Sequence, residues 1–139
     1  MAESPIIKKI QLTMYRVPMK DLTTDLAFAA GMFYEPGSVI YRDMLRVRIH
    51  TDAGVTGEHV SGTPGTLEPI RMFTPFLIGK NALERELFYN QAKVILRKND
   101  RMGIGPIDVA LWDLAGKYHN APVYRLLGGY RQKLPAYAS

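Results

Sequence analysis

His59 is one of three histidines in this sequence, and histidine is the residue type best suited to acid–base chemistry near neutral pH. It follows Glu58 in the glycine-rich segment GEHVSGTP, and an imidazole changes charge near neutral pH more readily than other side chains. We expect His59 either to contact a substrate or to be a solvated loop residue, because the sequence names no partner for it. Cysteine is absent, so chemistry by a thiolate nucleophile or at a thiolate metal site is excluded.

Asp113 is a second candidate, since a carboxylate next to Trp112 within a helical pattern could act as an acid. Polar groups that become buried are nearly always hydrogen-bonded, and Asp side chains often bond nearby backbone groups. We therefore expect Asp113 to be structural, bonded to a local backbone group. His50 alternates with Arg46 and Arg48 and is expected on a solvated face.

The first half of the chain predicts three strands. Apolar and polar residues alternate over 6–16 and again over 38–50, and the turn residues 51–54 connect the second run to a third at 55–60. The second and third strands should form a hairpin. The segment 18–37 is too long for a tight turn and carries three aromatic residues, so we expect a loop that acts as a lid.

The second half of the chain changes to helical periodicity. Thr66 is expected to cap a short helix, which Pro75 and Gly79 end. Asn81 and Glu84 have the spacing of a capping box at the start of a second helix, which should run to about residue 98.

A further helix should open at Gly105 and Pro106 and stop at Asn120, which tolerates the left-handed conformation. A short turn over 122–127 follows, and the alternating residues LPAYAS at 134–139 predict one more strand, which needs a partner. Strands followed by helices indicate an α+β fold, here a three-stranded antiparallel meander followed by three to four helices.

Composition and charge narrow the class of protein. A length of 139 residues with 47% apolar content suits one folded domain. The net charge of +5 raises the question of nucleic acid, but the basic residues are scattered among acidic ones, so no nucleic-acid partner is expected. No stretch has the pattern of a signal peptide or a membrane span, and cysteine is absent; we expect no membrane partner and a cytoplasmic protein.

Three segments together carry a family resemblance. GIGPIDVALWDLAGKYHNAPVYRLLGG at 103–129 resembles the segment that closes the N-terminal domain in the mandelate racemase and muconate lactonizing group of the enolase superfamily. TDAGVTGEHVSG at 51–62 is similar to the sheet hairpin of that family, and IKKIQLTMYRVP to its first strand. The resemblance implies a capping domain over 1–130, with 131–139 as a linker and the first strand of a (β/α) barrel that this chain does not contain.

The resemblance also implies a chemistry. Enzymes of this family, which are isomerases and lyases such as racemases and acid-sugar dehydratases, use Mg²⁺ to stabilise the enediolate formed when a base removes the proton alpha to a substrate carboxylate. It implies that the metal ligands and bases lie outside residues 1–139, so we expect no catalytic residue and no metal site in this chain. The partners implied are the barrel domain of the same protein and a small carboxylate or acid-sugar substrate.

The same resemblance suggests substrate contacts from the lid loop, the loop after the third strand and the last strand. They are Lys20, Phe33, Tyr34, His59, Tyr137 and Ser139. Lys20 could meet an acidic substrate group and the aromatic residues could exclude water, although ordinary packing of the aromatics on the domain is an equal alternative. Ser139 and Tyr137 would lie at the catalytic face of the barrel.

A different class of function stays open beside the enzyme domain. The chain could be a stand-alone interaction or assembly module without catalysis, in which a helix face or a sheet edge docks on a partner. A cap without its barrel would also expose apolar surface, so we expect a homo-oligomer.

Overall fold

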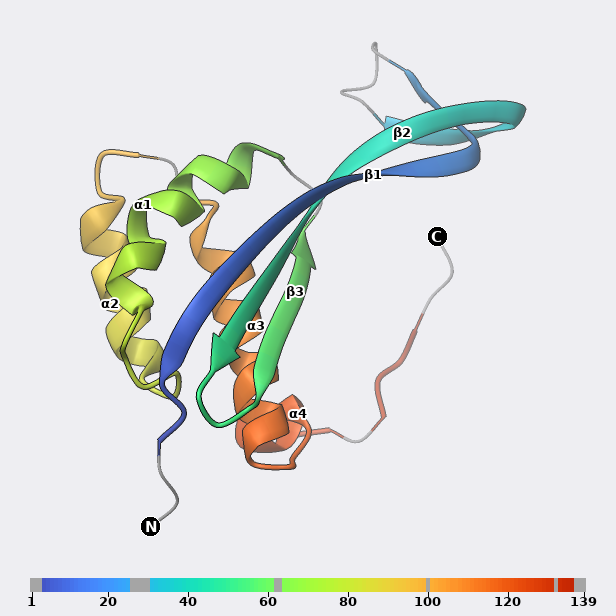
Figure 1. The fold of residues 1–139 in the computed structure, drawn as a ribbon. Helices are drawn as coiled ribbons and strands as arrows, with labels where there is room; N and C mark the ends of the chain where they lie inside the picture. Colours follow the sequence, from blue (N-terminus) through green and yellow to red (C-terminus); the bar gives the residue numbers. More distant parts are fainter. Residues whose placement is uncertain (1–3, 26–30, 62–63, 100, 132, 137–139) are drawn as a thin grey trace.

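The computed structural model describes residues 4–25, 31–61, 64–99, 101–131 and 133–136, and it has the predicted α+β fold (Figure 1). The elements in chain order are β1 (Ile7–Asp25), β2 (Gly31–Thr51), β3 (Thr56–Ser61), the 3₁₀ turn η2 (Pro64–Thr66), α1 (Leu67–Leu77), α2 (Arg85–Ile95), α3 (Ile104–Tyr118) and α4 (Val123–Leu126). The three strands form an antiparallel sheet in the order β1-β2-β3. The predicted meander followed by helices is therefore confirmed.

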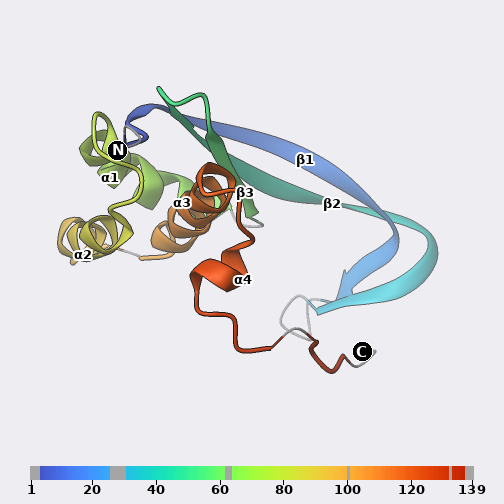
Figure 2. The same ribbon diagram turned by 90° about the horizontal axis from the view of Figure 1, so that it is seen from below.

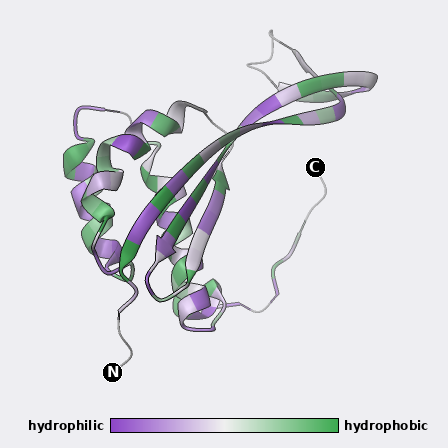
Figure 3. Ribbon diagram, viewed as in Figure 1, coloured by the Kyte–Doolittle hydropathy of each residue, from purple (hydrophilic) through white to green (hydrophobic). Residues whose placement is uncertain are grey.

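The sheet buries one face against the helices. Leu45, Val47 and Ile49 of β2 are fully buried, whereas Arg46 and Arg48 between them are only half-buried. This alternation follows from the two-residue period of a strand, and Figure 3 shows it as alternating colours along the strands. The helices lie together on the apolar side of the sheet in the view from below (Figure 2).

The prediction that 18–37 forms a lid loop is wrong, because most of this segment is paired in β-strands. β1 continues to Asp25 and β2 begins at Gly31, so the two strands form a long ribbon that extends beyond β3 (Figure 1). Residues 26–30 lie outside the described part of the chain. Pro18 is tolerated in the ribbon because β1 is an edge strand, on which a missing N–H need not break a ladder bond.

Two helix boundaries also differ from expectation. α1 passes through Pro75 to Leu77, and the carbonyl of Arg71, which a residue other than proline at position 75 would bond, lies 3.5 Å from the hydroxyl of Thr74. α2 begins at Arg85, because the side chain of Asn81 accepts a hydrogen bond from the Leu83 N–H at 3.0 Å and closes a local turn. The predicted capping box is therefore wrong.

α3 is the central helix of the core. Its buried residues include Ile107, Leu111 and Leu114, and the chain leaves it through Asn120, whose φ of 48° confirms the predicted left-handed stop. After α4 the described residues 133–136 are exposed and outside any strand, so the predicted strand at 134–139 has no partner among the described residues. Among the described helices, none has the length and apolar character needed to cross a membrane.

Candidate functional site

The ribbon and the end of β3 lie at the same end of the domain. β3 points toward the region where β1 and β2 leave the sheet, so its last residue, Ser61, lies at that end (Figure 1). Lys20 pairs with Val39 on the ribbon, while Phe33 and Tyr34 lie farther out. Four of the predicted site residues therefore lie on elements that meet at this end of the domain. Three of them, Lys20, Phe33 and Tyr34, lie on the ribbon, and the fourth, His59, lies on the sheet itself.

Phe33 and Tyr34 are exposed in this chain. Their side chains are 47% and 72% accessible, so neither is packed into the core of the domain. They are adjacent in a strand, paired with Thr23 and Leu22, and consecutive strand residues point to opposite faces. A ligand on one face of the ribbon can therefore meet only one of the two aromatic rings directly. Their predicted contact with substrate stays a prediction.

His59 lies within β3 and not in the loop after it. Its partner across the sheet is Val47, which is fully buried, so its imidazole lies on the side that faces the helices. His59 is half-buried there, and no hydrogen bond links its ring to another described residue. The expectation that His59 is a loop residue is therefore wrong, because His59 lies in a strand. Tyr137 and Ser139 lie outside the described residues.

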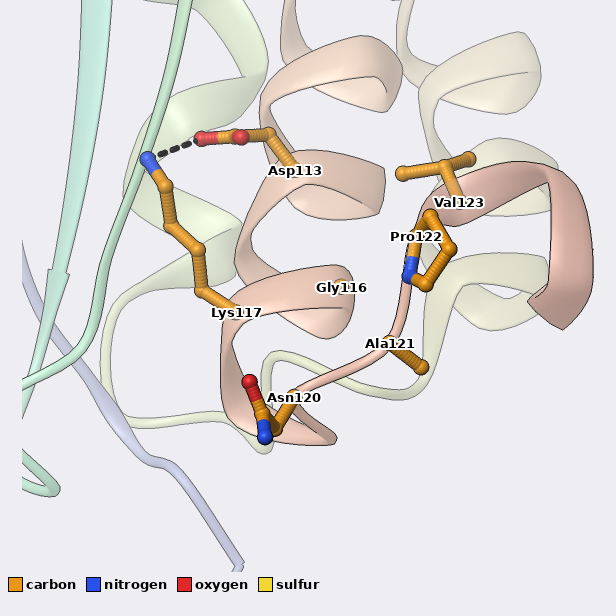
Figure 4. Close-up of a pocket in the computed structure, with 7 residues that line it drawn as sticks. All are labelled: Asp113, Gly116, Lys117, Asn120, Ala121, Pro122 and Val123. Carbon is orange, nitrogen blue, oxygen red and sulfur yellow. Dashed lines mark hydrogen bonds and ion pairs between the residues drawn. The ribbon is translucent and has the colours of Figure 1, made fainter.

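Asp113 and Lys117 of α3 form hydrogen bonds with backbone groups on the free edge of β3. Asp113 Oδ2 accepts a hydrogen bond from the Glu58 backbone N–H at 2.8 Å, and the ammonium of Lys117 donates to the Thr56 carbonyl at 3.1 Å. The two side chains also form an ion pair of 2.6 Å with each other (Figure 4). We name this arrangement the edge clasp. It protects an edge strand that would otherwise present unpaired backbone groups.

The structural role expected for Asp113 is confirmed, but its partner is not local in sequence. Glu58 is 55 residues away. One local signal does indicate an ion pair at this position. Asp113 and Lys117 are four residues apart, and this spacing favours an ion pair on a helix. The adjoining open cavity of about 360 Å³ is lined by the edge clasp and by the turn after α3 (Figure 4).

The outer face of the sheet carries a second polar group. Arg48 and Glu58 form an ion pair of 2.8 Å, and the Arg48 guanidinium lowers the pKa of the Glu58 carboxyl below its ordinary value, first through this hydrogen bond and then through its charge. His50 Nδ1 lies 3.1 Å from the Thr56 hydroxyl. His50 is half-buried, so the expectation of a solvated position holds only in part.

The described residues do not fit a magnesium site. No three His, Asp or Glu side chains in the described ranges come together in a group that could hold a metal ion. The carboxylates of the edge clasp and of Glu58 are engaged with cations, whereas Mg²⁺ in proteins takes oxygen ligands from carboxylates that converge on it. No step of a reaction is assigned to a metal in this part of the chain.

Replacing Asp113 with alanine is expected to destabilise the chain by about 1 to 2 kcal/mol, because the Glu58 N–H loses its acceptor and Lys117 its counter-charge. Asp113→Asn keeps an acceptor oxygen and loses only an ion pair whose Asp and Lys side chains are 34% and 46% exposed, so it should cost less than about 1 kcal/mol. Urea unfolding measures both variants. Equal losses in the two would contradict a role through the backbone bond.

The comparisons with known proteins agree with this architecture. The chain is 28% identical to 3,6-anhydro-alpha-L-galactonate cycloisomerase of Streptomyces coelicolor, over 96% of this chain and 38% of that protein. It is 37% identical to D-xylonate dehydratase of Haloferax volcanii, over 66% of this chain and 24% of that protein. The chain thus spans 38% of the length of the first of these curated relatives and 24% of the length of the second.

Solved structures and a family model give the same assignment. D-glucarate dehydratase from Agrobacterium tumefaciens, solved in complex with magnesium, matches with a TM-score of 0.66 and 27% identity, over 91% of this chain and 33% of that one. Residues 34–128 match the model of the mandelate racemase / muconate lactonizing enzyme N-terminal domain. The chain belongs to this family of N-terminal domains.

Proposed function

We propose that this chain is the capping and substrate-specificity domain of a magnesium-dependent enzyme of the enolase superfamily. The observation that carries the proposal is the combination of the family match over residues 34–128 with a coverage of only 38% and 24% of the two curated relatives. Residues 1–130 would form the cap, and residues 131–139 the linker and first strand of a barrel that lies outside this chain.

The proposed reaction removes the proton alpha to the carboxylate of an acid sugar or a related small acid. Such a carbon acid ionises at neutral pH only if a fixed positive charge meets the developing oxyanion, and in the complete enzyme Mg²⁺ bound by the barrel would supply that charge. The relatives support this substrate class, since they include a D-xylonate dehydratase and a D-glucarate dehydratase. Whether the outcome is dehydration, racemisation or cycloisomerisation depends on residues of the barrel.

The residues of this chain would bind and enclose the substrate. Lys20 is exposed on the ribbon and could neutralise an acidic group, while Phe33 or Tyr34 would exclude water and so strengthen the electrostatic interactions inside the site. Tyr137 and Ser139 would reach the substrate from the first barrel strand.

Large apolar side chains of the ribbon support a covering partner. Those that are more than one-third exposed are Met14, Tyr15, Met32, Phe33, Tyr34, Val39 and Tyr41. Exposed apolar surface of this kind marks interaction sites, so we propose that the barrel domain and further copies in a homo-oligomer cover part of it. A cytoplasmic location is part of the same proposal and rests on the absence of cysteine from the chain.

The test begins with the intact mass of the protein that the gene produces. We expect about 40 kDa, the size of a cap plus a barrel. That protein, incubated in D₂O with D-xylonate and D-glucarate in turn, should exchange the proton alpha to the carboxylate in one of the two, as followed by ¹H NMR. Chelation of Mg²⁺ should abolish the exchange, and Mg²⁺ should leave the Tm of the 139-residue chain alone unchanged.

Two results would count against the proposal. Exchange that persists after chelation would contradict a magnesium-dependent enzyme. A mass near 15.7 kDa together with a discrete oligomer would instead favour the stand-alone interaction module.

A further inference from the structure

We infer that Asp21, Gly37 and Ser38 form a clamp that fixes a bend in the β1–β2 ribbon, and that Asp21 is thereby a positioning residue for the substrate-covering end of the ribbon. This inference rests on the proposed function, because it assigns a role in substrate binding. The part beyond the bend is called the distal arm, and it comprises residues 22–25 and 31–34.

The strand register shows where the bend lies. Lys20 pairs with Val39, but the next pair is Leu22 with Tyr34. One residue of β1, Asp21, therefore faces a stretch of four residues of β2, 35–38. An excess of residues on one strand interrupts the ladder and bends the ribbon. Figures 1 and 2 both show the ribbon curving back on itself at its far end.

The backbone at the bend is conformationally special. Asp21 has φ 58° and Gly37 has φ 83°, so two left-handed residues face each other across the interruption. A left-handed conformation is uncommon for residues other than glycine, and Asp and Asn are among those that adopt it most readily. In the described residues, Asn120 at the end of α3 is the other non-glycine case. The sequence thus places tolerant residue types at both positions.

Side-chain hydrogen bonds join the two strands at the bend. Asp21 Oδ1 accepts from the Gly37 backbone N–H at 2.8 Å. The Ser38 hydroxyl lies 2.8 Å from the Leu22 carbonyl and 2.7 Å from the Glu35 carbonyl, and its one proton can serve either of them. These bonds replace the ladder bonds that the interruption removes, so the two strands stay connected where the ribbon turns.

The clamp matters because the distal arm has little else to orient it. A two-stranded ribbon is at best marginally stable without packing, and Phe33 and Tyr34 are both exposed. The direction in which the arm leaves the sheet is therefore set at the bend. A small change there would displace rings on the distal arm by a larger amount and weaken their contacts with the bound substrate, which raises KM.

Three variants of the full-length protein separate the possible roles of these groups. Asp21→Asn keeps both the tolerance of positive φ and an acceptor oxygen for the Gly37 N–H. Asp21→Gly keeps the tolerance of φ and removes the acceptor. Asp43→Asn is the matched control, because it weakens the exposed ion pair between Asp43 and Arg16 on the same ribbon, where the register is regular.

The expected kinetic result is a rise in KM without a matching loss of kcat. In Asp21→Gly the KM for the substrate found by proton exchange should rise about tenfold, with kcat changed by less than about twofold. Asp21→Asn and Asp43→Asn should behave as the unchanged protein. A merely structural role would lower the fraction of active enzyme, and so reduce kcat at constant KM.

Hydrogen exchange of the Gly37 amide tests the clamp without any measurement of enzyme activity. The Gly37 amide should exchange slowly in the unchanged protein and in Asp21→Asn, and much faster in Asp21→Gly. An unprotected Gly37 amide in the unchanged protein would overturn the clamp, whether or not the protein is active. An active protein in which Asp21→Gly exposes the Gly37 amide but leaves KM unchanged would overturn the positioning role. Failure of the proposed function is separate, since it would appear as absence of proton exchange in the unchanged protein.

Discussion

Replacing Gly57 with alanine is expected to destabilise the chain by about 3 kcal/mol. A Cβ at this position of β3 would lie 2.1 Å from the Ala110 carbonyl oxygen and 2.6 Å from Leu114 Cβ. Both neighbours belong to α3, and the carbonyl is backbone that cannot rotate away. β3 and α3 would have to separate, and the separation would disturb the edge clasp and the core around Leu114.

Urea unfolding, read by the intrinsic fluorescence of Trp112, measures this effect as a fall in the midpoint at an unchanged slope. Gly65→Ala is the control, because Gly65 is exposed and a Cβ there meets no atom within 4 Å beyond its chain neighbours. It should change the free energy of unfolding by less than about 0.5 kcal/mol. A Gly57→Ala variant as stable as the unchanged chain would show that β3 does not approach α3 so closely.

Removing the aromatic rings of the distal arm should produce the largest functional effect. In the full-length protein, the double variant Phe33→Ala, Tyr34→Ala is expected to lower kcat/KM by about tenfold to a hundredfold, because water would reach the substrate and its orientation would be lost. Since the two rings lie on opposite faces of the ribbon, one of the single variants should account for nearly all of the loss.

Leu127→Ala provides the control, because Leu127 is 64% exposed and lies after α4, far along the chain from the ribbon. It should leave kcat/KM unchanged, and the Tm of every variant should stay close to that of the unchanged protein, since none of the three side chains is in the core. Two single variants with equal losses would contradict a ligand on one face of the ribbon.

The edge clasp and the ribbon have different roles in this domain. Asp113 and Lys117 hold the first half of β3, next to the hairpin turn, against α3, which keeps the sheet rigid at the end opposite the ribbon. The exposed aromatic rings lie on the ribbon, outside that core. Sites on a rigid support are placed more accurately than sites on free loops, so a rigid sheet with a clamped ribbon suits the proposed role of covering a substrate held by another domain.

The sequence alone predicted the elements whose pattern is local. Leu45, Val47 and Ile49 alternate with arginines, and this was enough to place a half-buried strand, because side chains in a strand alternate between two faces. Asn120 marked the end of α3 for an equally local reason, its tolerance of positive φ. The order of strands and helices then implied an α+β fold, and the motifs implied the family.

The sequence did not predict features that depend on distant partners. The segment 18–37 has the proline and glycine of a loop, yet most of it pairs as a ribbon because the opposite strand supplies its hydrogen bonds. The bond from the Glu58 N–H to Asp113 joins residues 55 apart. Spacing along the chain cannot indicate such contacts, because they form only when the strand and the helix have packed.

The sequence itself therefore indicated the fold class through residue types and local periodicity, and the family through the resemblance of its motifs. That resemblance also made Lys20, Phe33 and Tyr34, with His59, candidate residues, and their roles stay predictions. The tertiary structure decided that His59 faces the helices, that the two rings lie on opposite faces of the ribbon, and that Asp21 clamps its bend. The physical reason is that strand pairing and packing fix the direction of a side chain, whereas the sequence fixes only its identity and its neighbours along the chain.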